Sequence, residues 1–165
     1  MTEPSDHPPF AGPPHALPDP LPIPALTLQR GRGPFNARVR PPGSKSLTKR
    51  ALLLGALAEG TSTIRRALLD ADDALRMLGA IAQLGATVIT TDSGDASIRG
   101  VAGRWAPSTP EVSLNLHNAG TATRFLAAAS VLSPGPVIID GNERMRQRPI
   151  GELISALAHL GVTAQ

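Results

Sequence analysis

The sequence predicts a mixed α/β fold in which one structural unit occurs twice. Residues 50–57 and 80–87 recur in similar form as residues 124–131 and 156–163. In each copy apolar residues return at helical spacing, and the short β-branched runs between them are typical of strands. A repeat that keeps these signals in the same order indicates duplication of one supersecondary unit. Each copy should contain a turn, an apolar helix, a short strand, an amphipathic helix ending at Leu-Gly, and another strand.

The N-terminal part of the chain differs from the repeats. Residues 1–24 hold nine of the seventeen prolines and almost no potential core, so they are predicted to form a disordered, proline-rich tail. Residues 25–41 are expected to hold the first strands, at 26–28 and 35–40. Residues 42–165 then contain the two copies of the unit.

The first copy is predicted to open with a helix directly after the turn at 42–46, which Ser46 can cap. Gly60 lies just past the end of this helix. The apolar face of the helix is expected to contain Leu47, Leu54 and Leu57. A strand at Thr63–Ile64 follows.

A second helix is predicted to begin at Ala74 and to stop at Gly85, with Asp72 or Asp73 as its cap. We interpret these two aspartates and Asp70 as structural and not as a metal site. The packed face of the helix is expected to contain Leu75, Leu78, Ala82 and Gly85. A strand at 87–91, a hairpin turn at 92–95 and a strand at 96–99 should complete the first copy.

The second copy should repeat this order with a turn at 118–124, a strand at 137–139 and a helix that stops at Gly161. The face of that helix is expected to contain Leu153, Leu157 and Leu160. The sequence ends at Gln165, before a further strand pair. We therefore expect the chain to be an N-terminal portion of a longer protein.

Composition narrows the classes of function. The chain has 165 residues and no cysteine, which suits one globular core and excludes disulfides, thiolate zinc sites and a cysteine nucleophile. The formal charge of +3 fits anionic ligands. One Trp, three Phe and no Tyr leave no stacking platform for nucleic acid. No apolar run approaches the roughly 20 residues of a membrane span, so we expect a cytoplasmic protein that binds neither nucleic acid nor membrane.

Two helix starts are candidates for binding an anion. The segment 43–46 combines free backbone amides, two hydroxyls and Lys45 at the start of a helix. Lys45 and Lys49 are the only lysines among sixteen basic residues, and a Lys in an Arg-rich chain suggests a compact charge or an amine that moves a proton. The turn at 118–124 has the equivalent place in the second copy. The two helix starts could therefore face one shared cleft.

A third candidate is the basic segment 144–149, which contains three arginines before Pro149. If it is extended, its guanidinium groups lie on one face and suit phosphate or carboxylate. The alternative is a solvated basic edge. Three other residues, His117, Trp105 and Met77, are interpreted as structural.

Together the three motifs resemble, in order and spacing, the signatures of the 3-phosphoshikimate 1-carboxyvinyltransferase (EPSP synthase) family of enolpyruvyl transferases. The resemblance covers about residues 26–165 and includes Arg50. A sister family that acts on a UDP-sugar usually has Asn at the position of Ser46, so Ser46 favours the shikimate branch. A UDP-sugar enolpyruvyl transferase and a non-catalytic anion-binding fragment are the alternatives.

The resemblance implies an inside-out α/β barrel of repeated βαβαββ units, incomplete in this chain. Members have two domains of three units each, with helices packed inside and the active site in the cleft between the domains. Residues 25–41 would belong to the far domain, and residues 42–165 to about two units of the other, truncated at the C-terminus. The full-length protein is expected to be a monomer.

The activity that the resemblance implies is transfer of the enolpyruvyl group of phosphoenolpyruvate to the 5-hydroxyl of shikimate 3-phosphate. The reaction releases phosphate, needs no metal or organic cofactor, and belongs to chorismate and aromatic amino acid biosynthesis. Lys45 matches the lysine that touches both substrates and assists proton transfer. The part of the family fold that lies outside this chain supplies the carboxylates proposed for proton transfer, so the chain is expected to be inactive alone.

The remaining site residues also come from the resemblance. Ser46 and Arg50 match contacts to shikimate 3-phosphate. Asn118, Gly120 and Arg148 match the phosphoenolpyruvate pocket.

Two positions depart from the family pattern. The family commonly has Asn at the position of Lys49, which we expect to face outward, and often Pro at the position of Phe125. Phe125 lies on the helix that sets the width of the phosphoenolpyruvate pocket in the family.

Overall fold

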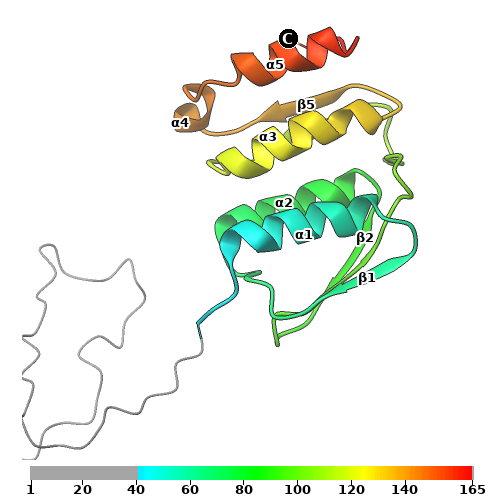
Figure 1. The fold of residues 1–165 in the computed structure, drawn as a ribbon, viewed down its shortest axis with the longest axis vertical. Helices are drawn as coiled ribbons and strands as arrows, with labels where there is room; N and C mark the ends of the chain where they lie inside the picture. Colours follow the sequence, from blue (N-terminus) through cyan, green and yellow to red (C-terminus); the bar gives the residue numbers. More distant parts are fainter. Residues whose placement is uncertain (1–40, 165) are drawn as a thin grey trace, which may run out of the picture. The chain divides into compact units, whose positions relative to one another are not determined.

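A computed structural model describes residues 41–164 of the chain. The predictions for the proline-rich tail and for the strands at 26–28 and 35–40 lie outside the described residues. Within them the chain forms a mixed α/β unit of helices and short strands (Figure 1). The elements are α1 (Lys45–Leu57), β1 (Thr61–Ile64), α2 (Asp72–Gln83), β2 (Thr87–Thr90), β3 (Ala96–Arg99), β4 (Val112–Asn115), α3 (Gly120–Ala129), the 3₁₀ turn η2 (Ser130–Leu132), β5 (Val137–Asp140), α4 (Glu143–Arg146) and α5 (Gly151–His159).

The strands form two small sheets. In the first, β3 lies between β1 and β2 and pairs antiparallel with both. The β2–β3 hairpin confirms the predicted strand, turn and strand. In the second sheet β4 and β5 run parallel, and α3 connects them in sequence. The sequence analysis did not assign β4, although its alternation of buried Val112 and Leu114 with exposed residues is typical of a strand.

Helix α1 begins at Lys45, inside the segment that was predicted to precede it, and its cap and its packed face also differ from the prediction. Ser44, and not Ser46, caps the helix, since its Oγ accepts from the Leu47 amide at 3.3 Å. Leu47 and Leu54 are exposed. The buried positions are Thr48, Lys49, Leu52, Gly55 and Ala56. Small side chains on this face let the sheet approach the helix closely, so the helix packs through a different stripe from the one its leucines suggested.

Helix α2 also packs through a different stripe. It begins at Asp72 and not at Ala74, and neither Asp72 nor Asp73 caps it. The predicted face is wrong in part: Leu75 and Ala82 are exposed, whereas Leu78 is partly buried against the core. The buried residues along this segment are Ala74, Met77, Ala80, Ile81 and Leu84.

The stop of α2 at Gly85 is confirmed. Gly85 has a φ of +106°, a conformation that favours glycine. A Cβ there would also overlap the backbone of Ala106. The close approach of these two segments joins the end of α2 to the loop that leads into the second copy.

One hydrophobic core joins both copies. It contains residues of α1, α2, β3, β4 and α3, and Trp105 is buried within it. The Trp105 Nε1 donates to the Ala129 carbonyl at the end of α3, at 2.7 Å. The structural roles expected for Trp105 and Met77 agree with their burial.

The basic segment is not extended. Residues 143–146 form the short helix α4, because the Asn142 side chain accepts from the Met145 amide at 2.9 Å and caps it. Met145 is buried. Along the next helix, α5, Leu157 is buried but Leu160 is exposed, so only part of its predicted face is packed. Among residues 41–164 no helix is long and apolar enough to cross a membrane.

Candidate functional site

The first residues of three helices line one surface pocket. Lys45, Asp72 and Gly120, which are the first residues of α1, α2 and α3, all line it. The other lining residues are Asp73, His117, Asn118, Thr121 and Arg148. The prediction that the helix starts of the two copies share one cleft is therefore confirmed, and Lys45 lies in the same pocket as Asn118, Gly120 and Arg148.

The three helix N-termini differ in how their positive ends are compensated. Helix α2 carries Asp72 and Asp73 in its first turn, whereas the first turns of α1 and α3 have no acidic residue. No side chain caps α3. Because a helix N-terminus favours negative charge, α1 and α3 can stabilise an anion that enters from outside. An anionic ligand is therefore favoured at the starts of α1 and α3, and Asp72 and Asp73 lie at the start of α2 in the same pocket.

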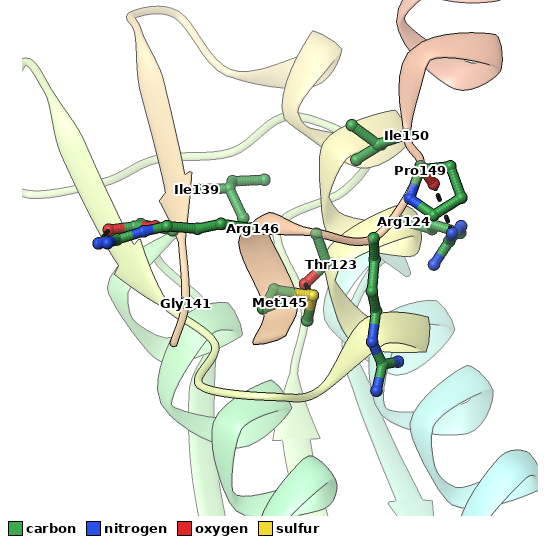
Figure 2. Close-up of a pocket in the computed structure, with 10 residues that line it drawn as sticks. Thr123, Arg124, Ile139, Gly141, Met145, Arg146, Pro149 and Ile150 are labelled. Atoms are coloured by element: carbon green, nitrogen blue, oxygen red, sulfur yellow. Dashed lines mark hydrogen bonds and ion pairs between the residues drawn. The ribbon is translucent and has the colours of Figure 1, made fainter. Parts of the chain in front are cut away.

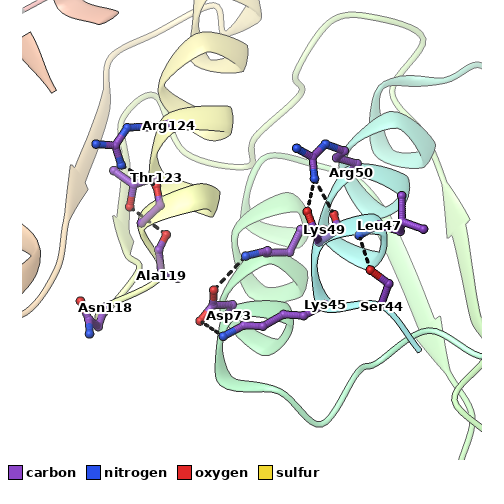
Figure 3. Close-up of polar contacts among 12 residues, drawn as sticks. Ser44, Lys45, Leu47, Lys49, Arg50, Asp73, Asn118, Ala119, Thr123 and Arg124 are labelled. Carbon is purple, nitrogen blue, oxygen red and sulfur yellow. Dashed lines mark hydrogen bonds and ion pairs between the residues drawn. The ribbon is translucent and has the colours of Figure 1, made fainter. Parts of the chain in front are cut away.

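Lys45 and Lys49 share one carboxylate (Figure 3). The Lys45 Nζ lies 3.1 Å from Asp73 Oδ1, and the Lys49 Nζ lies 2.9 Å from Asp73 Oδ2. Burial raises the pKa of the Asp73 carboxyl, but hydrogen bonds from Lys49 and Lys45 outweigh burial and hold that pKa below its usual value. The expectation that Lys49 faces outward is wrong: its side chain is 5% exposed, because its position lies on the packed face of α1.

Arg148 reaches the pocket and contacts the start of α3. Its Nη2 donates to Asn118 Oδ1 at 2.9 Å. Its guanidinium lies so close to Gly120 that a Cβ on that residue would overlap Nη1. Glycine at position 120 therefore leaves the space in which the Arg148 guanidinium sits beside the helix start.

Ser46 and Arg50 lie together but do not line this pocket. Arg50 Nη1 donates to the Ser46 carbonyl at 3.1 Å and also to the Ser46 hydroxyl. The Arg50 guanidinium lies over the ring of Phe125, with 5.2 Å from its Cζ to the ring centroid. Phe125 thus contributes to the position of Arg50, a cation–π contact that joins α1 to α3.

The three arginines of the basic segment do not share one face. Arg146 forms a two-pronged ion pair with Asp140, with Nε to Oδ1 at 2.8 Å and Nη2 to Oδ2 at 2.6 Å. Hydrogen bonds from Arg146, with the Gly141 amide, lower the pKa of Asp140 to about 2. Arg144 is exposed. Of the three, Arg148 alone lines the pocket beside Lys45.

A second pocket lies beside the first, and Arg148 lines both. Figure 2 shows it between α3, β5 and α4, with Met145 and Ile139 in its wall. Arg124 Nη2 donates to the Pro149 carbonyl at 2.6 Å. This bond ties the segment that carries Arg148 to helix α3.

Sequence reasoning missed three residues that line the pocket, namely His117, Asp72 and Asp73. His117 has a φ of +52° and its Nδ1 lies 3.5 Å from Asp72 Oδ2. His117 was interpreted as structural, but its side chain is half-exposed and lines the pocket. Asp72 and Asp73 were expected only as alternative caps of α2. The one sequence signal for the Asp73 cluster was that both lysines of the chain occur four residues apart.

Between residues 41 and 164, no group of three His, Asp or Glu side chains is placed to bind a metal ion.

Comparison with known proteins identifies the family. The sequence model of EPSP synthase (3-phosphoshikimate 1-carboxyvinyltransferase) matches residues 29–165. The chain belongs to the EPSP synthase family. A 3-phosphoshikimate 1-carboxyvinyltransferase of Rhizobium etli is 48% identical over 137 residues, which are 83% of this chain and 32% of the relative. The corresponding protein of Nitrosomonas eutropha is 49% identical over 124 residues, 75% of this chain and 28% of that protein.

Solved structures support the same assignment. An EPSP synthase structure from Acinetobacter baumannii superposes with a TM-score of 0.68 at 28% sequence identity. The match covers 75% of this chain and 27% of the other. The chain thus spans about a third of the length of the curated relatives it matches.

Proposed function

We propose that this chain supplies part of the site for enolpyruvyl transfer from phosphoenolpyruvate to the 5-hydroxyl of shikimate 3-phosphate. The observation that carries the proposal is the convergence of Lys45, Asn118, Gly120 and Arg148 on one pocket. These residues come from segments far apart in the sequence and match the family motifs. Both proposed substrates are multiply anionic, and the pocket offers two cations and two helix starts without an acidic residue in the first turn.

In this proposal each side chain has a separate task. The 5-hydroxyl oxygen bonds to C2 of phosphoenolpyruvate as the hydroxyl loses its proton and C3 gains one, which opens the C2=C3 double bond and gives a tetrahedral adduct. The C2–O bond to phosphate then breaks and C3 loses a proton, so that inorganic phosphate leaves and the enolpyruvyl double bond is restored. Arg148 and the start of α3 bind the anionic groups of phosphoenolpyruvate beside Asn118. Lys45 contacts both substrates and assists proton transfer. Preorganised cations and amides of this kind stabilise charge that develops in the transition state. No metal or cofactor takes part.

Ser46 and Arg50 are assigned to shikimate 3-phosphate. They lie on α1, the same helix as Lys45, and Arg50 is held by Ser46 and Phe125. A planar guanidinium fits a phosphate through two parallel hydrogen bonds. The two proposed substrate positions are therefore linked through α1.

We further propose the inside-out α/β architecture for the protein, with residues 42–165 as about two βαβαββ units and residues 25–41 as strands of the other domain. The mixed α/β fold, the shared core and the likeness to EPSP synthase structures support it. Residues 1–24 are assigned to a tail outside the fold. We expect a monomer when the family fold is complete, in the cytoplasm and without nucleic acid.

The test compares two arginines of one segment. Isothermal titration of the chain with phosphoenolpyruvate should detect binding, and Arg148→Gln should weaken it by roughly 10-fold to 150-fold, the worth of hydrogen bonds to a charged group. Arg144→Gln is the matched control, because Arg144 is exposed and does not line the pocket. Equal losses in both variants would indicate general basic attraction and contradict the proposal.

Turnover is tested separately. The chain is assayed for phosphate release from the two substrates, alone and mixed with the part of the Rhizobium etli relative that it does not match. We expect activity only in the mixture, and loss of that activity with Lys45→Met. Activity of the mixture that survives Lys45→Met would refute the role assigned to Lys45.

A further inference from the structure

The cluster around Asp73 is asymmetric. One carboxylate lies between two ammonium groups, but the Lys45 side chain is 53% exposed and the Lys49 side chain only 5%. Asp73 itself is 17% exposed. Lys45 lines the pocket, whereas Lys49 lies behind it on the packed face of α1. The two lysines therefore cannot have the same function.

Lys49 is fixed by its surroundings. A buried ammonium is costly unless a counter-ion and hydrogen bonds compensate it. The Asp73 Oδ2 supplies both at 2.9 Å. Lys45, by contrast, is largely in water and can exchange Asp73 for another anion at small cost, as exposed ion pairs contribute little.

This difference matters when an anion enters the pocket. If Lys45 turned toward the anion and Asp73 had no other partner, the partly buried carboxylate of Asp73 would lack a counter-ion. It would then repel the anion in the pocket. Lys49 prevents this, because it stays on Asp73 whichever way Lys45 points. The three groups together carry a net charge of +1, and that charge is available at Lys45.

We propose that Lys49 is a positioning residue, whose buried ammonium compensates Asp73 and so frees Lys45 to bind the substrate anion. The inference rests on the proposed function for the identity of that anion. Lys49 itself does not contact the ligand.

Charge-matched variants test the proposal. Lys49→Met removes one positive charge and leaves Lys45 as the single lysine partner of Asp73. The double variant Lys49→Met with Asp73→Asn returns the cluster to its original net charge. The two variants alter the same buried contact, so loss of the contact alone would affect both, whereas charge compensation predicts a loss in the first and a recovery in the second.

The first readout needs no ligand. The chain has only two lysines, so mass spectrometry can follow the acetylation of each one by an amine-acylating reagent. In the unmodified sequence Lys45 should react many times faster than Lys49. Lys49→Met should slow the acetylation of Lys45 several-fold, because Asp73 then holds it alone, and the double variant should restore the rate. Equal reactivity of the two lysines, or an unchanged Lys45 rate in Lys49→Met, would overturn the proposal.

The second readout is the binding of inorganic phosphate and of phosphoenolpyruvate. Lys49→Met should weaken both by about tenfold or more, equivalent to losing one favourable charge interaction, and the double variant should bind within a few-fold of the original. Circular dichroism checks that each variant keeps its helices. Failure of the double variant to recover affinity while folded would overturn the role of Lys49. Absence of anion binding in the unmodified chain, with the acetylation pattern intact, would instead overturn the proposed function.

Discussion

Gly120→Ala is expected to weaken anion binding without unfolding the protein. The added methyl group would overlap Nη1 of Arg148 and lie 3.3 Å from its Cζ. The three closest atoms to the new Cβ all belong to the Arg148 side chain. A flexible side chain can move where backbone cannot, so the guanidinium is displaced from its place beside the helix start.

The size of the effect follows from what the displaced guanidinium loses. It leaves its 2.9 Å contact with Asn118 and its position at the pocket. The anion in turn loses its hydrogen bond from the charged guanidinium, which contributes about 1.5 to 3 kcal/mol and corresponds to roughly 10-fold to 150-fold in affinity. Alanine is a better helix former than glycine, by up to about 1 kcal/mol inside a helix, which partly offsets the lost Asn118 contact, so the variant should remain folded.

The assay is isothermal titration with phosphoenolpyruvate, together with thermal unfolding of the free chain. Gly79→Ala is the matched control: Gly79 lies inside α2, and a Cβ there meets nothing within 4 Å. That variant should bind like the original chain and melt slightly higher. Unchanged affinity in Gly120→Ala would refute the assigned contact between Arg148 and the anion, and a similar loss in Gly79→Ala would refute its local origin.

Three further outcomes are expected. Lys45→Arg should bind phosphoenolpyruvate within a few-fold of the original, yet lower phosphate release in the complemented mixture by roughly 100-fold to 1000-fold, because a guanidinium does not deprotonate; full turnover would contradict a proton-transfer role. Because the pKa of Asp73 is lowered in the native state, its carboxylate stabilises the fold at pH values above the ordinary aspartate pKa of about 3.9. This stabilisation should be lost as the pH falls through the lower native pKa. Urea unfolding from pH 7 to pH 2 should therefore show a steeper fall in the free energy of unfolding than in Asp73→Asn, and equal slopes would contradict it. Trp105→Phe should lower the free energy of unfolding by about 1 to 3 kcal/mol, since the Ala129 carbonyl loses its donor, and urea titration measures it; an unchanged midpoint would show that the bond contributes nothing.

The sequence predicted the elements of the fold better than their packed faces. The two helices that open the copies and the β2–β3 hairpin follow from local turn chemistry, which a sequence shows directly, although α1 and α3 begin inside the predicted turns, at Lys45 and Gly120. Leu47 and Leu54 were expected inside because apolar residues at helical spacing usually mark the core. In α1 the sheet instead approaches a stripe containing Gly55 and Ala56, and the choice between stripes depends on partners far away in the sequence.

The candidate site was predictable where the family motifs include it. Lys45, Asn118, Gly120 and Arg148 were named from those motifs, and the structure brings them to one pocket. The partnership of Lys49 with Asp73 was not predictable, because it joins two helices and buries a charge that usually faces solvent. The prediction that the basic segment is extended was wrong for a local reason. Asn142 caps a helical turn at this position, and this capping outweighs the preference for extended backbone before Pro149.

The shared core around Trp105 bears on how the protein loses its structure. Repeat proteins whose units touch only their neighbours can open one unit at a time. In this protein Trp105, in the loop between the two copies, donates a hydrogen bond to Ala129, the last residue of α3. Its indole packs in the same hydrophobic cluster as residues of α1 and α2. Amide hydrogen exchange in α1 and in α3 should therefore proceed through the same global opening. Denaturant should abolish the anion pocket in one step, with no intermediate in which one helix start survives without the other.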